Sequence, residues 1–498
     1  MRSRLGDRPS RSRDPLSATA AGRRWRKEQE RRSAHLSDRG RVTLLGLVAV
    51  ALVGVAALAG WMASQRIVPP PQELADVAAP PPQLPDVPAE LLARVPVSRQ
   101  ALELPAVLGS GVEMGRVGDR GVSGRLFERV ALPDTGELSV EYTLDAELTR
   151  EVFRVLRQAR VARGHVILME PRSGRVLAYA STDTETFPAT EAYPAASLVK
   201  IITAAAALDA APEAAALPCR YRGDPYRLKL WQLDPPRKGR EISLRKALAT
   251  SNNACFAQLA VHAVGDAPLV EAIRRFGWTA SPAPAHAAGS VEPGEGRLAL
   301  GRLGCGLAGC RITPLHGAQL AGVLAHGELV APRWIDRVLD AEGRELPLPA
   351  SPTPRRVVSP ELAAELRDML TDTTTRGTAR SAFRKRGRPL LGEIRVAGKT
   401  GTLSGKRPDG RYEWFIGVAP ADEPRLVVAT LVLQSELYWR TASEIAAEVL
   451  HRSFCRDGVC SAEYADRWRR PSSAATARTR IPQRDARPGS VTRAPPRV

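Results

Sequence analysis

Three short motifs occur in a fixed order along this 498-residue chain, and any fold must bring their side chains together. They are Ser197-Leu-Val-Lys200, Ser251-Asn252-Asn253 and Lys399-Thr400-Gly401-Thr402. Lysine is scarce in the chain, with eight residues against 64 arginines, so two lysines within these motifs are conspicuous. A lysine amine can lose its proton, whereas an arginine cannot. The set therefore indicates a serine acyltransferase that works without histidine.

A second S-x-x-K match begins at Ser243, and geometry argues against it. Ser243 lies eight residues before Ser251. This is about 12 Å along a helix, at about 1.5 Å per residue, which is beyond hydrogen-bond reach. Ser197 has no such limit, and it begins a helical pattern in which Lys200 follows one turn later on the same face. Ser197 is therefore the predicted nucleophile; the alternative is a helix-capping serine beside a solvated lysine.

The first two motifs supply the groups that such a serine needs. A serine hydroxyl is a weak nucleophile and requires a base within hydrogen-bond reach. Lys200 is the predicted base, provided that burial and the second cation, Lys399, lower its pKa toward neutrality. We expect Ser251 to pass a proton to the leaving amine and Asn253 to orient the substrate amide.

The third motif is expected to hold the substrate. Lys399 would set the local electric field, while the hydroxyls of Thr400 and Thr402 would bind a substrate carboxylate. The strand edge at Gly401–Thr402 can align a peptide by β-addition, which leaves backbone N–H groups for an oxyanion. No metal or cofactor is needed for this chemistry, and none is predicted.

An uncharged segment follows a basic N-terminus. Residues 1–41 carry 13 Lys and Arg against five Asp and Glu, a net charge of +8, whereas residues 42–64 contain no charged side chain. A segment of this length spans a bilayer core of about 30 Å. The basic flank should remain in the cytoplasm. The sequence thus predicts a cytoplasmic tail (1–41) and a single transmembrane helix (42–64), with the rest of the chain outside the cytoplasm.

The distribution of charge argues against a nucleic-acid partner. The chain has a net charge of +19, but residues 467–498 hold another +8, which leaves only +3 for the 425 residues between the two basic ends. The excess therefore belongs to the ends rather than to the body. Residues 456–498 are interpreted as an Arg-rich disordered tail.

The six cysteines fit an oxidising compartment. Their spacing gives two equally spaced pairs and one remaining pair, namely Cys305 with Cys310, Cys455 with Cys460, and Cys219 with Cys255. Disulfides within these pairs are one of the connectivities that six cysteines allow, and buried free thiols are the alternative. Zinc is not expected, because no C-x-x-C or paired histidines accompany the cysteines.

The remaining patterns divide the chain outside the membrane into a spacer and a catalytic body. Residues 65–138 form a Pro-rich spacer followed by a small module of uncertain character. The body, residues 139–455, begins with an amphipathic helix and a predicted β-hairpin over 165–180. A second group of strands lies at its end, with helices between the two groups. This order implies one antiparallel sheet whose halves meet in space, with a helical subdomain inserted in the middle.

From about residue 140 to 455 the chain resembles the transpeptidase domain of the penicillin-binding proteins, which cross-link peptidoglycan and are acylated by β-lactams. Segments that carry the resemblance beyond the motifs are Ala247-Leu-Ala-Thr-Ser-Asn-Asn-Ala-Cys-Phe, Ile312-Thr-Pro-Leu-His-Gly-Ala-Gln-Leu, Arg376-Gly-Thr-Ala and Trp414-Phe-Ile-Gly-Val-Ala-Pro. The resemblance implies an α+β fold: a five-stranded antiparallel sheet flanked by helices plus an all-helical lobe, behind a single N-terminal transmembrane helix. It also implies that Ser197 is acylated, with Lys200 as its base.

The function implied is that of a peptidoglycan D,D-transpeptidase, which forms an acyl-enzyme on Ser197 with D-Ala-D-Ala stem peptides and binds β-lactams. The enzyme would be anchored in the bacterial inner (cytoplasmic) membrane with its catalytic domain in the periplasm. Other cell-wall synthesis proteins are further candidate partners. Two alternatives use the same residues: a D,D-carboxypeptidase or serine β-lactamase, and a non-catalytic β-lactam sensor or cell-wall scaffold.

Overall fold

The computed structural model describes residues 86–99, 114–115, 125–132, 136–434 and 440–468. All of them belong to one of the chain's two compact units, Leu84–Val498. The predicted cytoplasmic tail and the predicted transmembrane segment, 42–64, lie outside the described residues. Within the described part of the chain, none of the helices has the length and apolar character needed to cross a membrane.

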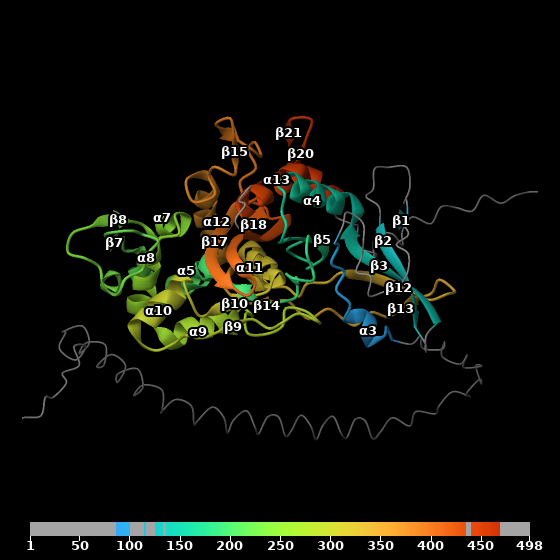
Figure 1. Cartoon of the computed structure of the whole chain (residues 1–498), viewed down its shortest axis with the longest axis horizontal. Coiled ribbons are helices and arrows are strands. Elements are labelled where there is room, and N and C mark those ends of the chain that lie inside the picture. Colours follow the sequence, from blue (N-terminus) through green and yellow to red (C-terminus); the bar gives the residue numbers. More distant parts are fainter. Residues whose placement is uncertain (1–85, 100–113, 116–124, 133–135, 435–439, 469–498) are drawn as a thin grey trace, which may run out of the picture. The chain divides into compact units, whose positions relative to one another are not determined.

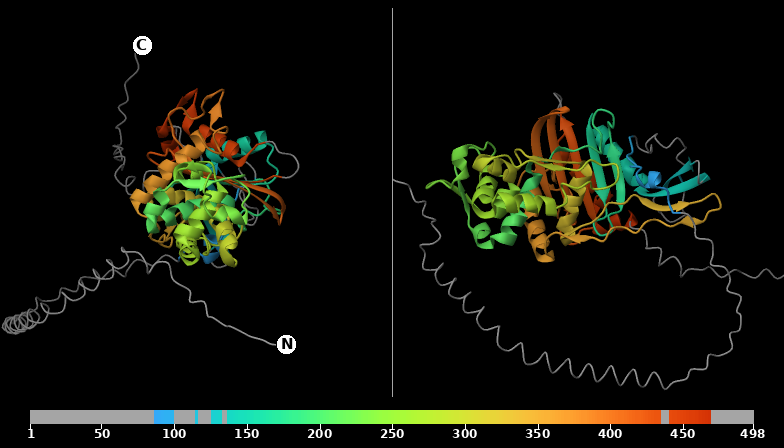
Figure 2. Two further views of the ribbon diagram at one scale, coloured as in Figure 1. Left: turned by 90° about the vertical axis from the view of Figure 1, so that its left-hand side faces the viewer. Right: turned by 90° about the horizontal axis from the view of Figure 1, so that it is seen from below.

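A five-stranded antiparallel sheet forms the centre of the fold, as predicted (Figures 1 and 2). In spatial order its strands are β17 (Ala397–Lys406), β18 (Asp409–Ala419), β19 (Leu426–Gln434), β4 (Gly164–Met169) and β5 (Val176–Ser181). The predicted hairpin over 165–180 is β4 and β5, and β4 pairs with β19 from the far end of the chain. The two groups of strands therefore meet in space, and β17 is left at the sheet edge.

The two faces of this sheet are buried by different helices, because successive side chains of a strand point to opposite faces. Trp414 and Ile416 of β18 pack in the core that contains α11 (Pro314–His326). Phe415, between them, packs in a second core with α4 (Ala146–Gln158) and α13 (Ala442–Phe454). The third motif lies on β17, directly beside these buried strands.

The helical lobe lies between the two groups of strands in the sequence and on one side of the sheet in space (Figure 2). Its helices are α5 (Val199–Ala210), α6 (Pro212–Ala216), α7 (Leu244–Ala249), α8 (Asn253–Leu259), α9 (Asp266–Arg275) and α10 (Gly296–Cys305). Helix α12 (Pro360–Thr375) then packs against α7, α11 and β17. The α+β class is therefore confirmed. The prediction that the lobe is all-helical is wrong, because β7 (Cys219–Tyr221) and β8 (Arg240–Ile242) form an antiparallel pair between α6 and α7.

A second five-stranded sheet was not predicted. Its order is β1 (Met114–Gly115), β2 (Arg125–Leu132), β3 (Gly136–Asp145), β12 (Ile335–Leu339) and β13 (Glu345–Leu346). The predicted domain boundary at residue 139 falls inside β3, which pairs with β2 on one side and with β12 on the other. Residues before the boundary are therefore joined to the catalytic body by a continuous ladder, because β12 comes from a distant part of the sequence.

The ordered structure extends past residue 455. Residues 456–468, which the sequence assigned to a disordered tail, belong to a hairpin of β20 (Cys455–Arg456) and β21 (Val459–Cys460) and to a 3₁₀ helix (Ala462–Trp468). The side chain of Trp468 is buried in the same core as α4 and α13. This apolar burial explains why a segment of polar composition is ordered.

Candidate active site

The predicted nucleophile lies at a strained turn that leads into a buried helix. Ser197 is in a 3₁₀ turn (Ala196–Leu198) directly before α5. Ala196 has φ +50°, a left-handed conformation that costs a non-glycine residue free energy. The backbone of Gly306 packs directly against this turn. The approach is so close that a Cβ added at Gly306 would lie 2.0 Å from the Ala196 carbonyl oxygen. The packing thus keeps Ser197 at the start of α5 in a conformation that the chain would not choose alone.

Lys200 is fully buried and lies at the centre of the hydrogen-bond network. Its Nζ is 2.7 Å from Ser197 Oγ, 2.6 Å from Asn253 Oδ1 and 3.3 Å from Ser251 Oγ. Burial lowers the pKa of Lys200 to about 8, because the charged amine loses its hydration. A substantial fraction of the amine is therefore neutral near physiological pH.

The second motif lies in the turn between α7 and α8, and each of its residues has a separate structural task. Ser251 adopts φ +56°, which turns the chain so that its hydroxyl faces both lysines. Asn252 caps α8 by accepting a hydrogen bond from the Cys255 N–H at 3.1 Å. Asn253 accepts from Lys200 and donates through Nδ2 to the Tyr226 carbonyl at 2.6 Å. Both ends of this amide are therefore engaged within the protein, so Asn253 positions Lys200 as well as lining the cleft.

The third motif brings a second buried amine to the same hydroxyl. Lys399 Nζ donates to Ser251 Oγ at 2.9 Å and to the Thr400 carbonyl at 2.8 Å. Burial, together with the repulsion from Lys200, holds the pKa of Lys399 well below its usual range. Ser251 Oγ thus accepts from two amines, which leaves its single O–H free to donate into the cleft.

The edge of β17 forms one wall of the site. A Cβ at Gly401 would lie only 3.2 Å from the Ala196 Cβ, so the absence of a side chain there lets the strand approach the nucleophile turn. Trp414 Nε1 fixes the same junction by donating to the Pro194 carbonyl at 2.9 Å. Thr400 Oγ1 forms a 2.6 Å hydrogen bond with Thr378 Oγ1, while Thr402 is exposed in the cleft.

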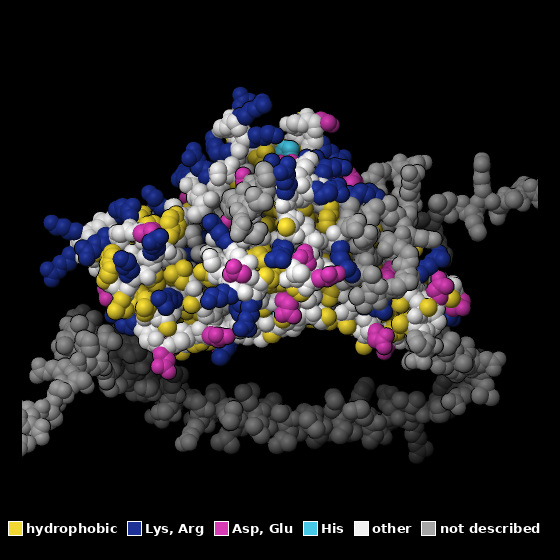
Figure 3. All heavy atoms as spheres, viewed as in Figure 1, with side chains coloured by type: hydrophobic (Ala, Val, Ile, Leu, Met, Phe, Trp, Pro, Cys, Tyr) yellow, Lys and Arg dark blue, Asp and Glu magenta, His cyan; other side chains and the backbone are white. Residues whose placement is uncertain are grey.

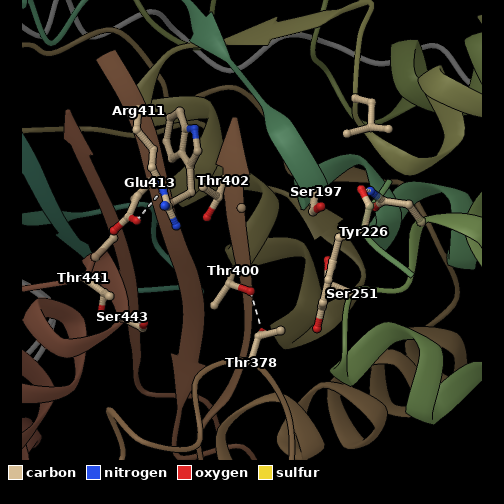
Figure 4. Close-up of a pocket in the computed structure, with 15 residues that line it drawn as sticks. Ser197, Tyr226, Ser251, Thr378, Thr400, Thr402, Arg411, Glu413, Thr441 and Ser443 are labelled. Carbon is tan, nitrogen blue, oxygen red and sulfur yellow. Dashed lines mark hydrogen bonds and ion pairs between the residues drawn. The ribbon is translucent and has the colours of Figure 1, made fainter. Parts of the chain in front are cut away.

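Six of the eight predicted residues line a cleft of about 440 Å³ (Figure 4). The other two, Lys200 and Lys399, are fully buried and contact the lining hydroxyls of Ser197 and Ser251. Sequence reasoning missed the other lining residues, which are Tyr226, Leu307, Thr378, Arg411, Glu413, Trp414, Thr441, Ala442 and Ser443. Thr378 and Trp414 do lie in segments that carried the family resemblance. The rest had no signal in the sequence, because they reach the cleft only through long-range packing.

The S-x-x-K match at Ser243 lies outside this site. The Ser243 hydroxyl accepts a hydrogen bond from the Lys246 N–H and caps α7, so this serine has a structural role. The segment from 243 to 264 is not one helix, because the left-handed turn at Ser251 divides it. Ser243 still cannot act together with the second motif, because α7 separates it from Ser251 and its hydroxyl is used as the cap of that helix.

Two of the three cysteine pairs are joined in the structure. Cys219 is bonded to Cys255 and Cys455 to Cys460. The predicted bridge between Cys305 and Cys310 does not form, and both thiols are free and buried. Cys305 ends α10 in a hydrophobic core, whereas Cys310 lies on β10 (Cys310–Ile312), whose pairing with β9 (Ser290–Val291) holds it in place.

One group of potential metal ligands occurs among the described residues, and it does not support a metal site. The group consists of His451 with Cys455 and Cys460. The two sulfurs are already bonded to one another, so neither can act as a thiolate ligand.

Comparison with known proteins agrees with this geometry. The family model for the penicillin-binding protein transpeptidase domain matches residues 164–454, which contain all three motifs. This chain belongs to that family. The match covers the central sheet, the helical lobe and the whole of the cleft described above.

Relatives within the family are distant in sequence. The chain is 28% identical over 311 residues to peptidoglycan D,D-transpeptidase PbpA of Mycobacterium tuberculosis strain H37Rv, covering 54% of this chain and 62% of the relative. It is also 28% identical over 347 residues to stage V sporulation protein D of Bacillus subtilis, covering 60% of this chain and 50% of the relative. The chain thus spans less than two thirds of the length of these curated relatives.

Solved structures share the fold. The crystal structure of PBPA from Mycobacterium tuberculosis superposes with a TM-score of 0.52 at 25% identity, covering 64% of this chain and 81% of that one. A penicillin G acyl-enzyme complex of penicillin-binding protein A from the same organism gives a TM-score of 0.51 at 25% identity, covering 62% and 78%.

Proposed function

We propose that this protein is a peptidoglycan D,D-transpeptidase, which forms an acyl-enzyme on Ser197 and transfers the acyl group to an acceptor amine. The observation that carries the proposal is the 2.7 Å contact between Ser197 Oγ and a buried Lys200 amine whose pKa is lowered to about 8. The names of the PbpA relatives support the same activity.

Acylation follows from the contacts of these two residues. The neutral Lys200 amine accepts the Ser197 proton as Oγ attacks the carbonyl carbon of the D-Ala-D-Ala amide. Ser251 then passes its proton to the departing D-alanine nitrogen and receives one in return from the Lys200 ammonium, which restores the neutral Lys200 amine, while Lys399 donates a further hydrogen bond to Ser251 Oγ. The bond from carbonyl carbon to nitrogen breaks, an ester on Ser197 forms, and D-alanine leaves as a free amine.

The walls of the cleft account for substrate binding. The outer edge of β17 is unpaired among the described strands, so an extended peptide can add to it as a further strand. Backbone N–H groups of this edge and of the Ser197 turn are the candidates for holding the oxyanion. The Thr402 hydroxyl and the Thr400–Thr378 pair are candidates for binding the terminal carboxylate of a stem peptide or a β-lactam.

The alternative hydrolytic functions differ in what attacks the ester. Efficient hydrolysis requires a base that activates water near Ser197. Glu413 is the one carboxylate among the described residues that line the cleft, and its Oε1 lies 3.1 Å from Arg411 Nε, on β18 rather than beside Ser197. This arrangement argues against a β-lactamase that uses a carboxylate base. Lys200, 2.7 Å from Ser197 Oγ, can activate either water or an amine, so the reaction products have to distinguish a carboxypeptidase from a transpeptidase.

Mass spectrometry of the products separates the candidates. The full chain in detergent is incubated with a stem peptide ending in D-Ala-D-Ala, with and without an acceptor amine. A transpeptidase forms the amide-linked product and an acyl-enzyme on Ser197. A carboxypeptidase releases only the shortened peptide. A sensor forms neither product, although it forms a stable adduct in a parallel incubation with a β-lactam.

The cellular placement belongs to the same proposal. Residues 42–64 would anchor the enzyme in the bacterial inner membrane, with residues 1–41 in the cytoplasm and the catalytic body in the periplasm. The bonded cysteine pairs support an oxidising compartment. Fused after Leu92, a reporter that works only after export should be active. Activity of a reporter that works only in the cytoplasm, fused at the same position, would contradict the proposed topology.

A further inference from the structure

A basic hairpin lies in the segment that connects α12 to β17. Its strands are β15 (Arg384–Lys385) and β16 (Arg388–Pro389), and they pair across a tight turn. Residues 376–392 contain no Asp or Glu and six cations, which are Arg376, Arg380, Arg384, Lys385, Arg386 and Arg388. One short segment thus holds a larger positive charge than the net charge of +3 of the 425 residues between the basic ends.

These six side chains are available to a partner. All six residues are exposed, and none of their side chains forms a salt bridge with another residue in the part of the chain that the structure describes. Figure 3 shows Lys and Arg side chains gathered at the top of the view, where Figure 1 places β15. Arg384 also donates to the Gly387 carbonyl, a neutral acceptor, so its positive charge is not balanced by an acidic group.

The hairpin is firmly attached despite its exposed tip. Phe383 at its base is buried, with its ring 5.3 Å from the ring of Phe415 in the sheet, and its carbonyl accepts a 2.9 Å hydrogen bond from the Leu390 N–H. The turn uses the left-handed conformations of Arg386 and Gly387. The cations are therefore presented from a fixed base rather than from a free loop.

The basic segment includes one residue that lines the active-site cleft. Thr378 lines the cleft and contacts Thr400, and its N–H donates to the Ala249 carbonyl at 3.1 Å, beside the second motif. Arg376 and Arg380 flank Thr378 in the sequence. The basic segment therefore begins within two residues of a side chain that lines the cleft.

We propose that the segment 376–388 is a docking surface for a carboxylate-bearing polymer, one repeating unit of which is the acyl donor. The inference rests on the proposed function. While one stem peptide of the polymer occupies the cleft, the neighbouring stem peptides of the same polymer lie outside it and carry further carboxylates. An anionic lipid surface would also attract these cations. The polymer is favoured because the segment that carries the cations also contributes Thr378 to the cleft, which has to receive the same molecule.

The experiment measures binding of the full-length protein in detergent to purified, uncross-linked peptidoglycan strands by co-sedimentation at increasing salt. The test variant is R384Q/K385Q/R386N/R388Q, in which Asn tolerates the left-handed turn. Each exposed ion contact is weak, so we expect the four changes together to weaken binding about tenfold at low salt and to reduce its salt dependence. Strands whose carboxylates have been amidated should bind the wild type as weakly as intact strands bind the variant.

Two controls isolate charge and position. The variant R384K/R386K/R388K keeps the charge and should bind like the wild type. The exposed pair Arg237 and Lys238, in the loop before β8 (Arg240–Ile242), allows R237Q/K238Q to be compared with K385Q/R386N at equal change in charge. Only the hairpin pair should weaken binding.

The outcomes separate this inference from the proposed function. Labelling by a fluorescent penicillin should be the same in the wild type and in all of these variants, and absence of labelling in the wild type would contradict the function itself. Normal labelling with strand binding that is insensitive to the hairpin would overturn the docking surface alone. Loss of binding to anionic phospholipid vesicles, with strand binding unchanged, would overturn it in favour of a lipid partner.

Discussion

The pH dependence of β-lactam acylation tests whether Lys200 acts as the base. With a pKa of about 8, roughly one tenth of the amine is neutral at pH 7 and about nine tenths at pH 9. Only the neutral form can accept the Ser197 proton across the 2.7 Å contact. The acylation rate should therefore rise about tenfold between pH 7 and pH 9 and then level off.

The substitution Lys200→Arg removes the neutral form while it keeps the positive charge. Acylation should fall at least about a hundredfold, the lower range for loss of a general base, and the rise with pH should disappear. The matched control is Lys246→Arg in the other S-x-x-K match. The Lys246 side chain is exposed and does not line the cleft. This variant should keep both the rate and the pH profile.

The assay follows covalent labelling by a fluorescent penicillin over time at a series of pH values, with each variant's folding checked by circular dichroism. A rate that is flat between pH 7 and pH 9 in the wild type would refute the assignment of Lys200 as the base. Near-normal labelling of a folded Lys200→Arg variant at pH 7 would refute it as well, since another group would then have to accept the proton.

Three further predictions concern the rest of the cleft. Penicillin labelling should be lost in Ser197→Ala and kept in Ser243→Ala, whereas labelling of Ser197→Ala would require another nucleophile. Thr402→Val should slow acylation by carboxylate-bearing substrates about tenfold to a hundredfold but leave amidated substrates nearly unaffected, and equal losses would make Thr402 a structural residue. Gly306→Ala places a Cβ 2.0 Å from a carbonyl oxygen and should lower both thermal stability and acylation; Gly343→Ala, with a similar φ and open space, should cost only about 1 kcal/mol of unfolding free energy and no activity.

The parts of the site that could be predicted from the sequence depend on local geometry. Ser197 and Lys200 are one helical turn apart, so their contact follows from the spacing alone once α5 is recognised. The hairpin of β4 and β5 and the turn before β18 also carry local signals in their glycine and proline residues. The convergence of the three motifs was inferred from chemistry, because only their joint presence explains two lysines in a chain that otherwise uses arginine.

The parts that could not be predicted depend on contacts between distant segments. β12 pairs with β3 although about two hundred residues separate them in the sequence, and the residue pattern of neither strand predicts which strand it will pair with. The left-handed conformation of Ser251 is imposed by its surroundings, since serine has no intrinsic preference for it. Equal spacing suggested that Cys305 and Cys310 would pair like Cys455 and Cys460, but spacing says nothing about the elements that hold each thiol.

The electrostatics of the site explain why its lysines are buried without acidic partners. In the described structure Lys200 forms hydrogen bonds only with hydroxyl and amide oxygens, with the Phe256 ring 5.8 Å from its Nζ, and Lys399 forms them with a hydroxyl and a carbonyl. A carboxylate at hydrogen-bond distance would stabilise the ammonium form and raise the pKa of the amine, which would remove the base. Neutral oxygen acceptors orient the amine while they leave the cost of burying its charge uncompensated. The absence of acidic partners therefore lowers the stability of the folded protein and, for the same reason, supplies the neutral amine that the chemistry requires.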